Sequence, residues 1–373
     1  MGEIQKKDWD SLASALPQPL IQYEFLKLLE DSGSVCPQTG WQSAHFTLWQ
    51  DEKMVAAAPL YIKAHSWGEF VFDMAFAQAA ESRGWDYYPK LVGTLPLSPV
   101  PGWRILLAPG LVLGEVWDIF NEATKEFIFR ENLRGRHLLW GDPEISLGNL
   151  PEVGAPWDHQ AFLWENEDYG NFQDFLDRFD KNQRRNIRRE IQRPLNQNLE
   201  LRFENGFNLS PEIYEKMEYF YQKTNDQFGP MGAKFLTPEF FYGLQKAAGG
   251  NCWFSGAYNP GTFEPLALAL ILEKGGQAFG RYWGTVIEAD SLHFNLCYYL
   301  PQAQAIEKGW KKFDPGMGGE HKTRRGFRSV NRPSYHWSPD HRINRLFLEN
   351  FPRFNAMEQT TIETLNAQSP IKN

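Results

Sequence analysis

The segment 252–283 places the strongest constraint on the fold, because three strand-like runs follow one another there with short turns between them. Residues 252–258, 265–273 and 277–283 are dominated by apolar and aromatic side chains. The turn at residues 274–276 has the sequence Lys-Gly-Gly, and glycine adopts the backbone conformations that tight hairpins require. We therefore predict an antiparallel meander of three strands in the second half of the chain.

Helical patterns lie on both sides of this meander, and further strand-like pieces follow it. Apolar residues recur at helical spacing before and after it, and Pro238 behind Thr237 suits the first turn of a helix. The helices are expected at 211–228, 238–248 and 298–308, and the additional strands at 291–295, 311–315 and 323–330. Two helices, a meander, then strand, helix and strand resembles the element order of the GNAT acetyltransferase fold.

The first half of the chain shows a looser version of the same order. Its helices are expected at 19–31, 74–82 and 115–132, and its strands at 44–50, 54–62, 137–140 and 159–164. A chain of 373 residues is too long for one ordinary hydrophobic core. We predict an α/β fold with mixed sheets, organised as two tandem domains at 1–165 and 166–373, the second of which carries the active site.

Composition excludes several classes of protein. The formal net charge of −8 argues against a general nucleic-acid coat protein, which needs a broad positive field. The cysteines Cys36, Cys252 and Cys297 show no CxxC spacing, which indicates a reducing compartment and no metal site. No secretory signal is visible, and prolines break the apolar stretch 92–113, so it cannot span a bilayer as one helix. We expect a cytoplasmic protein without an integral membrane segment.

One strongly basic stretch, residues 181–193, stands out in this acidic chain. Its lysine and arginines recur every three or four residues, which gathers most of them on one helical face. Arg184, Arg185 and Arg188 are therefore candidates for contact with a phosphate or with an RNA backbone. A solvated helix face is the alternative interpretation.

Four segments resemble a known bacterial family. They are residues 39–73 with PLYIKAHSWGEFVFD, 87–91 with YYPKL, 280–299 with GRYWG and LHFNLCYY, and 319–327 with GEHKTRRGF. In this order they resemble the FemAB-like or peptidoglycan biosynthesis/recognition proteins, a branch of the GNAT superfamily. The resemblance covers nearly the whole chain and implies a double GNAT-like (acyl-CoA N-acyltransferase) fold.

The resemblance also implies transfer of an acyl or aminoacyl group to an amine. Fem-type transferases use aminoacyl-tRNA to modify the peptide of a cell-wall precursor, whereas ordinary GNAT enzymes use acyl-CoA. The acceptor would be a small molecule or a peptide. This chain has Asn295 where the family commonly has an acidic residue, and Leu300 where glutamine is common. An alternative function is therefore a non-catalytic GNAT-like module that binds a peptidoglycan precursor or peptide.

Acyl transfer to an amine needs a bound donor, a neutral amine and stabilisation of the oxyanion. Backbone N–H groups beside glycines, together with basic side chains, suit the phosphates of the donor. The candidate donor-binding residues are Gly318, Gly319, Lys322, Arg324, Arg325 and Gly326. For proton removal we favour His293 together with Glu320, although His293 could be a core histidine and Glu320 an ion-pair partner of an arginine.

Arg281 is a candidate for binding a substrate carboxylate or the oxyanion, or for a structural ion pair. A nucleophilic Cys297 next to His293 is disfavoured, because isolated cysteines are usually packing residues. Polar and aromatic side chains around these motifs are candidates for binding the acceptor: Lys63, His65, Trp67, Tyr88, Lys90, Tyr282, Trp283, Tyr298 and His321.

Overall fold

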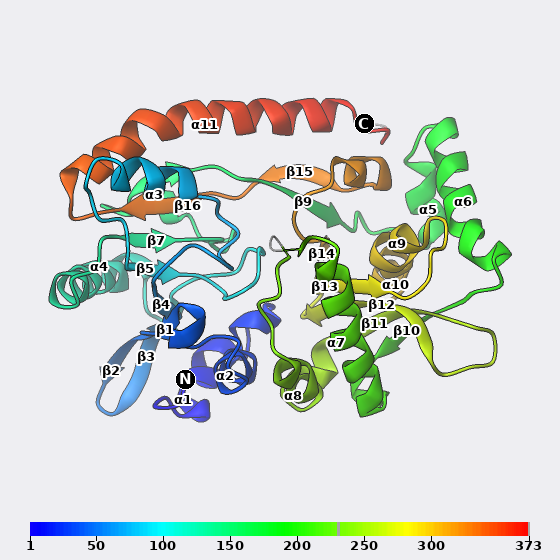
Figure 1. Ribbon diagram of the computed structural model, residues 1–373, viewed down its shortest axis with the longest axis horizontal. Helices are drawn as coiled ribbons and strands as arrows, with labels where there is room; N and C mark the ends of the chain where they lie inside the picture. The colour runs from blue at the N-terminus through cyan, green and yellow to red at the C-terminus, as the bar shows by residue number, and fades with distance from the viewer. Residues whose placement is uncertain (230–231, 372–373) are drawn as a thin grey trace. The chain divides into compact units, whose positions relative to one another are not determined.

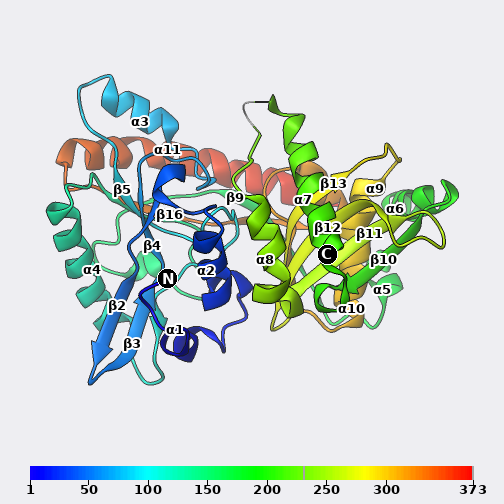
Figure 2. The ribbon, with the colours of Figure 1, turned by 60° about the horizontal axis from the view of Figure 1, so that its bottom comes forward.

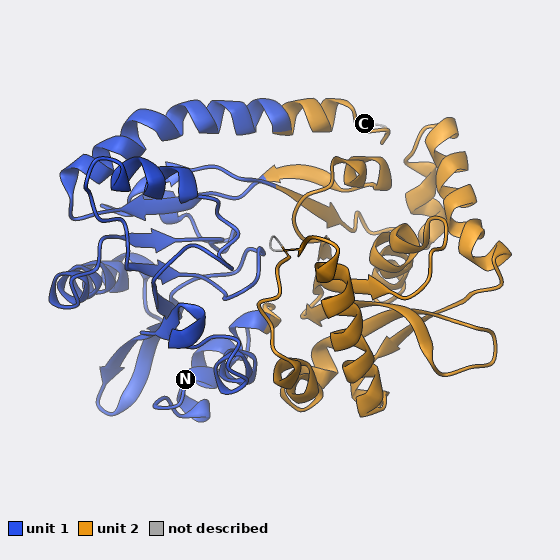
Figure 3. Cartoon of the chain, in the orientation of Figure 1, with its two compact units in different colours: residues 1–16, 20–160, 331–361 blue, residues 17–19, 161–330, 362–373 orange. Residues whose placement is uncertain are grey.

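The computed structural model describes residues 1–229 and 232–371, and the chain divides into two compact units (Figure 3). Unit 1 comprises residues 1–16, 20–160 and 331–361; unit 2 comprises residues 17–19, 161–330 and the chain from Ile362 onward. The change of unit at residues 160/161 lies near the expected boundary at 165/166. Residues 331–361 belong to unit 1 because one of their strands pairs within its sheet.

Unit 1 contains a six-stranded mixed sheet in the order β1-β4-β5-β7-β16-β8 (Figure 1). The strands are β1 Trp41–Ser43, β4 Leu60–Lys63, β5 Lys90–Gly93, β7 Arg136–Leu138, β16 Ser334–Trp337 and β8 Ala155–Trp157. A second, three-stranded sheet has the order β2-β3-β6, with bounds β2 Phe46–Gln50, β3 Lys53–Ala58 and β6 Leu106–Leu107. The single strand expected at 54–62 is therefore wrong: Pro59, which has no N–H to donate, separates β3 from β4.

The helices of unit 1 are α1 Lys6–Ala13, α2 Tyr23–Asp31, α3 Met74–Glu81, α4 Leu113–Arg130 and the part of α11 (His341–Ala367) up to residue 361. α1 packs against β3 and β6 of the three-stranded sheet, whereas α4 and α11 cover the two faces of the six-stranded sheet. On one face, Val116 and Phe120 of α4 form an apolar core with Leu91 and Leu138. On the other face, Phe347 of α11 packs against α3 and lies 6.1 Å from the ring of His137. The second face thus carries polar side chains under an aromatic cover.

Unit 2 contains a seven-stranded mixed sheet in the order β10-β11-β12-β13-β14-β9-β15, whose strands are labelled in Figure 1; Figure 2 shows β10 to β13 from another side. The strands are β10 Glu200–Asn205, β11 Cys252–Tyr258, β12 Pro265–Lys274, β13 Gln277–Thr285, β14 Lys312–Asp314, β9 Gln160–Glu165 and β15 Arg328–Asn331. β11, β12 and β13 form the antiparallel meander expected from the sequence, and β14 runs parallel to β13. The predicted mixed α/β class is confirmed.

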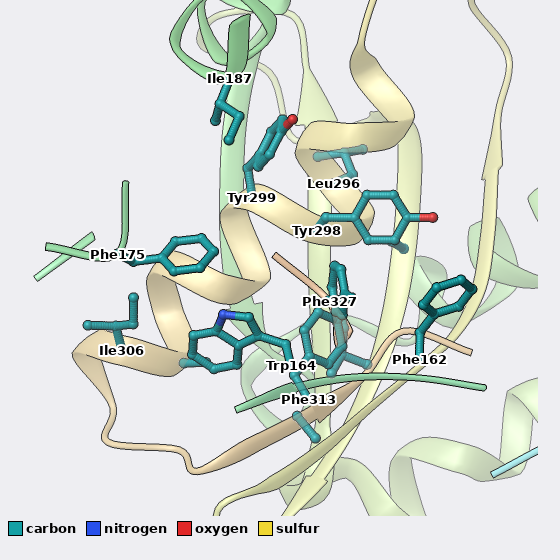
Figure 4. Packing of buried hydrophobic residues seen from close by; sticks show 14 of the residues in the cluster. Phe162, Trp164, Phe175, Ile187, Leu296, Tyr298, Tyr299, Ile306, Phe313 and Phe327 are labelled. Carbon is teal, nitrogen blue, oxygen red and sulfur yellow. The ribbon is translucent and has the colours of Figure 1, made fainter. Parts of the chain in front are cut away.

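The helices of unit 2 pack on both faces of this sheet. They are α5 Phe172–Asp177, α6 Lys181–Asn196, α7 Pro211–Asp226, α8 Pro238–Ala248 and α10 Leu300–Glu307, which follows α9 Leu292–Phe294. α7 approaches β13 closely at Gly284, where an added Cβ would lie 2.3 Å from the backbone oxygen of Phe220. Opposite α7, buried aromatic residues from several elements form the core, among them Trp164, Phe175, Tyr298 and Phe327 (Figure 4).

The strand expected at 291–295 is wrong, because these residues begin a helix. α9 continues without a break into a π-helical turn at Asn295–Tyr299 and then into α10. Leu292 and Leu296 are buried four residues apart, which is helical spacing, and both face the core. A short apolar run does not distinguish a strand from a helix, and here packing on the sheet decides.

Candidate functional site

The site in unit 2 begins at an irregularity of strand β13. Leu270 of β12 pairs with Tyr282, whereas its neighbour Ile271 pairs with Gly280, so Arg281 is the extra residue of a β-bulge. β13 pairs with β14 only from Gln277 to Phe279. A bulge bends its strand and interrupts the ladder. The two parallel strands therefore stop pairing beside Arg281, and the segments that follow them carry most of the candidate residues.

His293, from the first turn of α9, is surrounded by aromatic side chains. Its ring centroid lies 5.1 Å from that of Trp283 and 5.3 Å from that of Tyr298. The ring of His321 lies 6.3 Å away, and Nε2 of His321 is 3.2 Å from the hydroxyl of Tyr298. We refer to Trp283, His293, Tyr298 and His321 as the His293 cluster. His321 of the glycine-rich turn (residues 316–326) and Trp283 near the end of β13 therefore both lie next to the imidazole of His293.

The electrostatic surroundings keep this imidazole neutral. Burial, together with the nearby His321, Lys322 and Arg325, lowers the pKa of His293 to about 4. Burial also lowers the pKa of His321. At neutral pH His293 is therefore unprotonated and able to accept a hydrogen bond or a proton.

Lys322 and Arg325 are held by partners inside unit 2. Lys322 is buried, and its Nζ donates to the backbone oxygens of Gly316 at 2.8 Å and Met317 at 3.1 Å. Arg325 is also buried and donates from Nη2 to both carboxylate oxygens of Glu190, at 3.0 and 2.9 Å. Both side chains stabilise the glycine-rich turn through these internal contacts. Binding of the donor by Lys322 and Arg325 stays a prediction.

The outer side of the same turn is open to solvent. Gly318 and Gly319 are exposed and have φ values of 68° and 84°, which favour glycine. Glu320 and Arg324 are exposed as well, and neither side chain has an ion-pair partner among the described residues. Gly326, with φ of 87°, is buried where a Cβ would lie 2.5 Å from the Phe175 ring. Backbone N–H groups for an anion are thus available at Gly318 and Gly319.

The two side chains beside the bulge face opposite sides of the sheet. Trp283 contacts His293, whereas the Tyr282 ring packs against Tyr221 and Phe241 of the helical layer, with centroids 5.3 and 5.9 Å away. Alternation does not hold at a bulge, and the guanidinium of Arg281 lies 5.2 Å from the centroid of the Tyr282 ring, where its charge acts on Tyr221. Arg281 and Tyr282 therefore lie on the other side of the sheet from the His293 cluster.

Asn295 and Cys297 lie in the π-helical turn and serve the structure. The Asn295 side chain donates to the backbone oxygens of Glu190 at 2.9 Å and Ser291 at 2.8 Å, and it is buried. A carboxylate could not make these two donations. Burial raises the pKa of the Cys297 thiol far above its ordinary value, which fits a packing role. π-helical turns are frequent at functional sites.

The basic residues of 181–193 lie on α6, which continues past Pro194 to Asn196. Arg184 forms an ion pair with Asp177 at 2.6 Å, and Arg188 donates to the amide oxygen of Gln173 at 2.9 Å. Arg185 is exposed and has no ion pair among the described residues. Arg185 and Arg188 are thus two exposed positive charges, of the predicted three, that have no ion pair among the described residues.

The remaining candidates lie in unit 1. Lys90 is buried and donates to Ser66 Oγ, Glu69 Oε2 and Asp73 Oδ2. Lys63 is also buried; its Nζ donates to the Trp67 backbone oxygen at 3.0 Å and lies 3.5 Å above the Trp41 ring. Tyr88 bonds Ser66 at 2.8 Å, and Trp67 and His65 are partly exposed. We refer to Lys63, Ser66, Glu69, Asp73 and Lys90 as the Lys90 network.

Sequence reasoning missed two acidic residues that organise these places: Glu190 and Asp73. Glu190 stands among arginines on α6 and was hidden by them. Asp73 lies with Glu69 in the motif HSWGEFVFD, where a buried carboxylate would have been signalled only by the two lysines. Among the described residues no group of three metal-ligating side chains occurs, and no helix is long and apolar enough to cross a membrane.

A separate cavity of about 880 Å³ lies in unit 1. Its lining includes apolar residues such as Phe46, Leu60 and Phe127 and the ion pair between His45 and Glu30. None of the predicted acceptor residues lines this cavity.

The meander, the bulged strand with a parallel neighbour and the helix that follows define a GNAT-like α/β protein. Solved structures with the same fold include FemX, with a TM-score of 0.55 and 11% identity over 92% of this chain and 98% of that chain. A conserved protein of unknown function from Bacteroides thetaiotaomicron VPI-5482 has a TM-score of 0.52 and 11% identity over 90% and 97%. The C-terminal domain of a protein described as a lysylphosphatidylglycerol synthetase, from Agrobacterium fabrum, has a TM-score of 0.52 and 9% identity over 92% and 94%.

The chain belongs to the FemAB-like family, described as peptidoglycan biosynthesis/recognition, whose profile matches residues 1–373. The family expected from the sequence is therefore confirmed. No curated protein matches the sequence significantly.

Proposed function

We propose that this protein is an N-acyltransferase of the aminoacyl type, which transfers an acyl group from a phosphate-bearing donor to an amine of a peptidoglycan precursor peptide. The observation that carries the proposal is the neutral, half-buried His293 at the place where β13 and β14 stop pairing. Membership of a peptidoglycan biosynthesis/recognition family supports the choice of acceptor.

The reaction requires few groups from the protein. The amine nitrogen attacks the carbonyl carbon of the donor, and His293 accepts the proton that the amine loses. The tetrahedral oxyanion then collapses, the carbonyl–oxygen or carbonyl–sulfur bond of the donor breaks, and the leaving group takes up a proton. A histidine of pKa about 4 is a weak base. Donor phosphates near Lys322 and Arg325 would raise the pKa of His293 and thereby strengthen it as a base.

For the donor we favour aminoacyl-tRNA over acyl-CoA. The loop before α9, residues 286–291, contains Glu288 and Asp290 and no glycine. Acidic side chains at a helix N-terminus repel the pyrophosphate that a glycine-rich loop in this place would bind. The basic side of α6, with Arg185 and Arg188, offers charge for an RNA backbone instead.

A transfer assay tests this function. The purified protein is mixed with a muramyl pentapeptide and with one of two donors, a pool of aminoacylated tRNAs or acyl-CoA thioesters. Mass spectrometry then measures the mass of the peptide. We expect a mass increase of one aminoacyl residue with tRNA. Binding of the peptide without any product from either donor would favour the non-catalytic alternative.

A further inference from the structure

One face of the six-stranded sheet of unit 1 carries a row of basic side chains. Trp41 of β1 pairs with Lys63 of β4, which pairs with Lys90 of β5. Val92, two residues further along β5, pairs with His137, and His137 pairs with His336. Directly paired residues, and residues two apart in a strand, point to the same face. Two lysines and two histidines therefore lie side by side across four strands, and all are buried.

The loop after β4, residues 64–73, places two carboxylates over this row. Lys90 uses its three N–H bonds on Ser66 Oγ at 2.8 Å, Glu69 Oε2 at 2.9 Å and Asp73 Oδ2 at 2.6 Å. The side chains of Lys90, Glu69 and Asp73 are 0%, 0% and 1% exposed. Lys90 is therefore saturated as a donor and has no capacity for another ligand.

The two carboxylates are not saturated. Glu69 Oε1 and Asp73 Oδ1 have no hydrogen-bond partner among the described residues, although both atoms are buried. A buried acceptor of a charged group that is left without a donor destabilises the folded state. The network is thus short of hydrogen-bond donors. Its charges balance when both lysines are protonated and both carboxylates are ionised, and also when Glu69 is protonated and Lys63 is neutral.

The unpaired oxygens, Glu69 Oε1 and Asp73 Oδ1, determine which kind of ligand could bind here. Both are acceptors, so an anionic ligand such as a phosphate or carboxylate would be repelled, whereas an ammonium group would donate to both. Aromatic rings surround the network: Tyr87 and Tyr88 each lie 5.5 Å from the Nζ of Lys90, and Trp41 lies under Lys63. Aromatic faces attract cations.

We propose that Glu69 and Asp73 bind the ammonium group of a ligand that is an aliphatic primary amine. The preference for an ammonium group rests on the geometry of unit 1 and is independent of the proposed transfer reaction, in which a neutral amine reacts beside His293 of unit 2. Burial raises the pKa of Glu69 to about 7 and lowers the pKa of Lys63 to about 7. An added ammonium would lower the pKa of Glu69 and hold its carboxylate ionised.

Access to these oxygens requires movement of the loop 64–73, because the side chains of Glu69 and Asp73 are 0% and 1% exposed. The outer side of the loop carries Trp67, which is 47% exposed, and Phe72, which is 61% exposed. Gly68, with φ of 81°, lies in the middle of the loop, where an added Cβ would be 2.6 Å from the Leu97 side chain. The loop is thus a cover with apolar residues on its outer surface and acidic residues on its inner surface.

The test uses two probes that differ in one amine. Calorimetry measures binding of Nα-acetyl-L-lysyl-D-alanyl-D-alanine, which has a free ε-amine, and of its Nα,Nε-diacetyl form. On the unaltered protein we expect the free-amine probe to bind at least about tenfold more tightly. Glu69→Gln and Asp73→Asn should each remove this preference, whereas Glu81→Gln, an exposed acid on α3, should keep it. Thermal melts without a probe check that each variant folds.

Equal affinity for the two probes on the unaltered protein, or no binding of either, overturns the proposal without any variant. A preference for the free-amine probe that survives in folded Glu69→Gln also overturns the proposal. The unpaired carboxylate oxygens would then be hydrogen-bonded to a buried water. Amine preference that requires Glu69, in a protein that forms no product from either donor, supports this inference and refutes the proposed transferase function.

Discussion

Arg325 shows how a single buried residue holds the turn beside the His293 cluster. Its guanidinium makes two hydrogen bonds to Glu190 and lies 3.4 Å above the Phe294 ring, and its side chain is 5% exposed. Glu190 also accepts from the hydroxyl of Tyr299. Removal of one member of such a pair leaves a partly buried charge without compensation.

We therefore predict that Arg325→Ala lowers the free energy of unfolding by about 3 kcal/mol. Urea denaturation followed by circular dichroism measures the change. Arg324→Ala is the matched control, because Arg324 is exposed, and its effect should stay within about 0.5 kcal/mol. Equal effects of the two substitutions would contradict the importance assigned to the Glu190 pair.

His293 is the residue on which the proposed chemistry depends. We predict that His293→Ala lowers kcat by about 10²-fold or more, since general-base help typically contributes that much. The melting temperature should change little, because His293 is only half-buried. His341→Gln, at an exposed position on α11, should leave kcat unchanged. Full activity of folded His293→Ala would exclude a role for this imidazole in proton transfer.

At the scale of an element, α6 packs into the core of unit 2 on one side and exposes positive charge on the other. Ile187 is buried in the core and Glu190 holds Arg325, while Arg185 and Arg188 face solvent. The spacing of three and four residues separates these sides on one helix. Changes on the exposed side therefore alter the surface charge and leave the packing intact.

For the double substitution Arg185→Ala with Arg188→Ala we predict about tenfold weaker tRNA binding. The slope of log Kd against log salt concentration should fall by about 1.5, because fewer counterions are released on binding when phosphate contacts are lost. Filter binding at several salt concentrations measures both quantities. Lys7→Ala with Lys53→Ala removes two exposed charges from unit 1 and serves as the control. If both double variants weaken binding equally, the effect comes from net charge alone.

At the scale of the whole molecule, stability depends on histidines that are buried without charge. Burial lowers the pKa of His336 to about 3 and that of His159 to about 4. The unfolded chain binds protons on these residues near pH 6.5, whereas the folded chain does not. Protonation therefore favours the unfolded state, and stability falls as the pH drops below about 6.5.

We accordingly predict that the free energy of unfolding decreases between pH 6.5 and pH 4, by up to about 1.4 kcal/mol per pH unit for each of these two histidines. Glu69 opposes part of this loss, because its raised pKa makes the folded state the better proton binder between about pH 4.5 and 7. Urea denaturation across this range measures the slope. His336→Asn, if folded, should flatten it; an unchanged slope would assign the acid sensitivity to other groups.

The sequence by itself determined the elements whose pattern is local. The meander, the helices α7 and α8 and the mixed α/β class follow from apolar periodicity and turn residues, because each element buries one side of itself. The candidates His293, Tyr298, Trp283 and His321 were also chosen from residue type and order, and they lie together.

Only the tertiary structure decided which partners these side chains have. Arg325 meets Glu190 from 135 residues away in the chain, and Lys90 meets Glu69 and Asp73 across a loop. The run at 291–295 became a helix because Leu292 within it and Leu296 just after it pack on the sheet from one side. Long-range contacts depend on how strands and helices assemble, and local periodicity holds no information about that assembly.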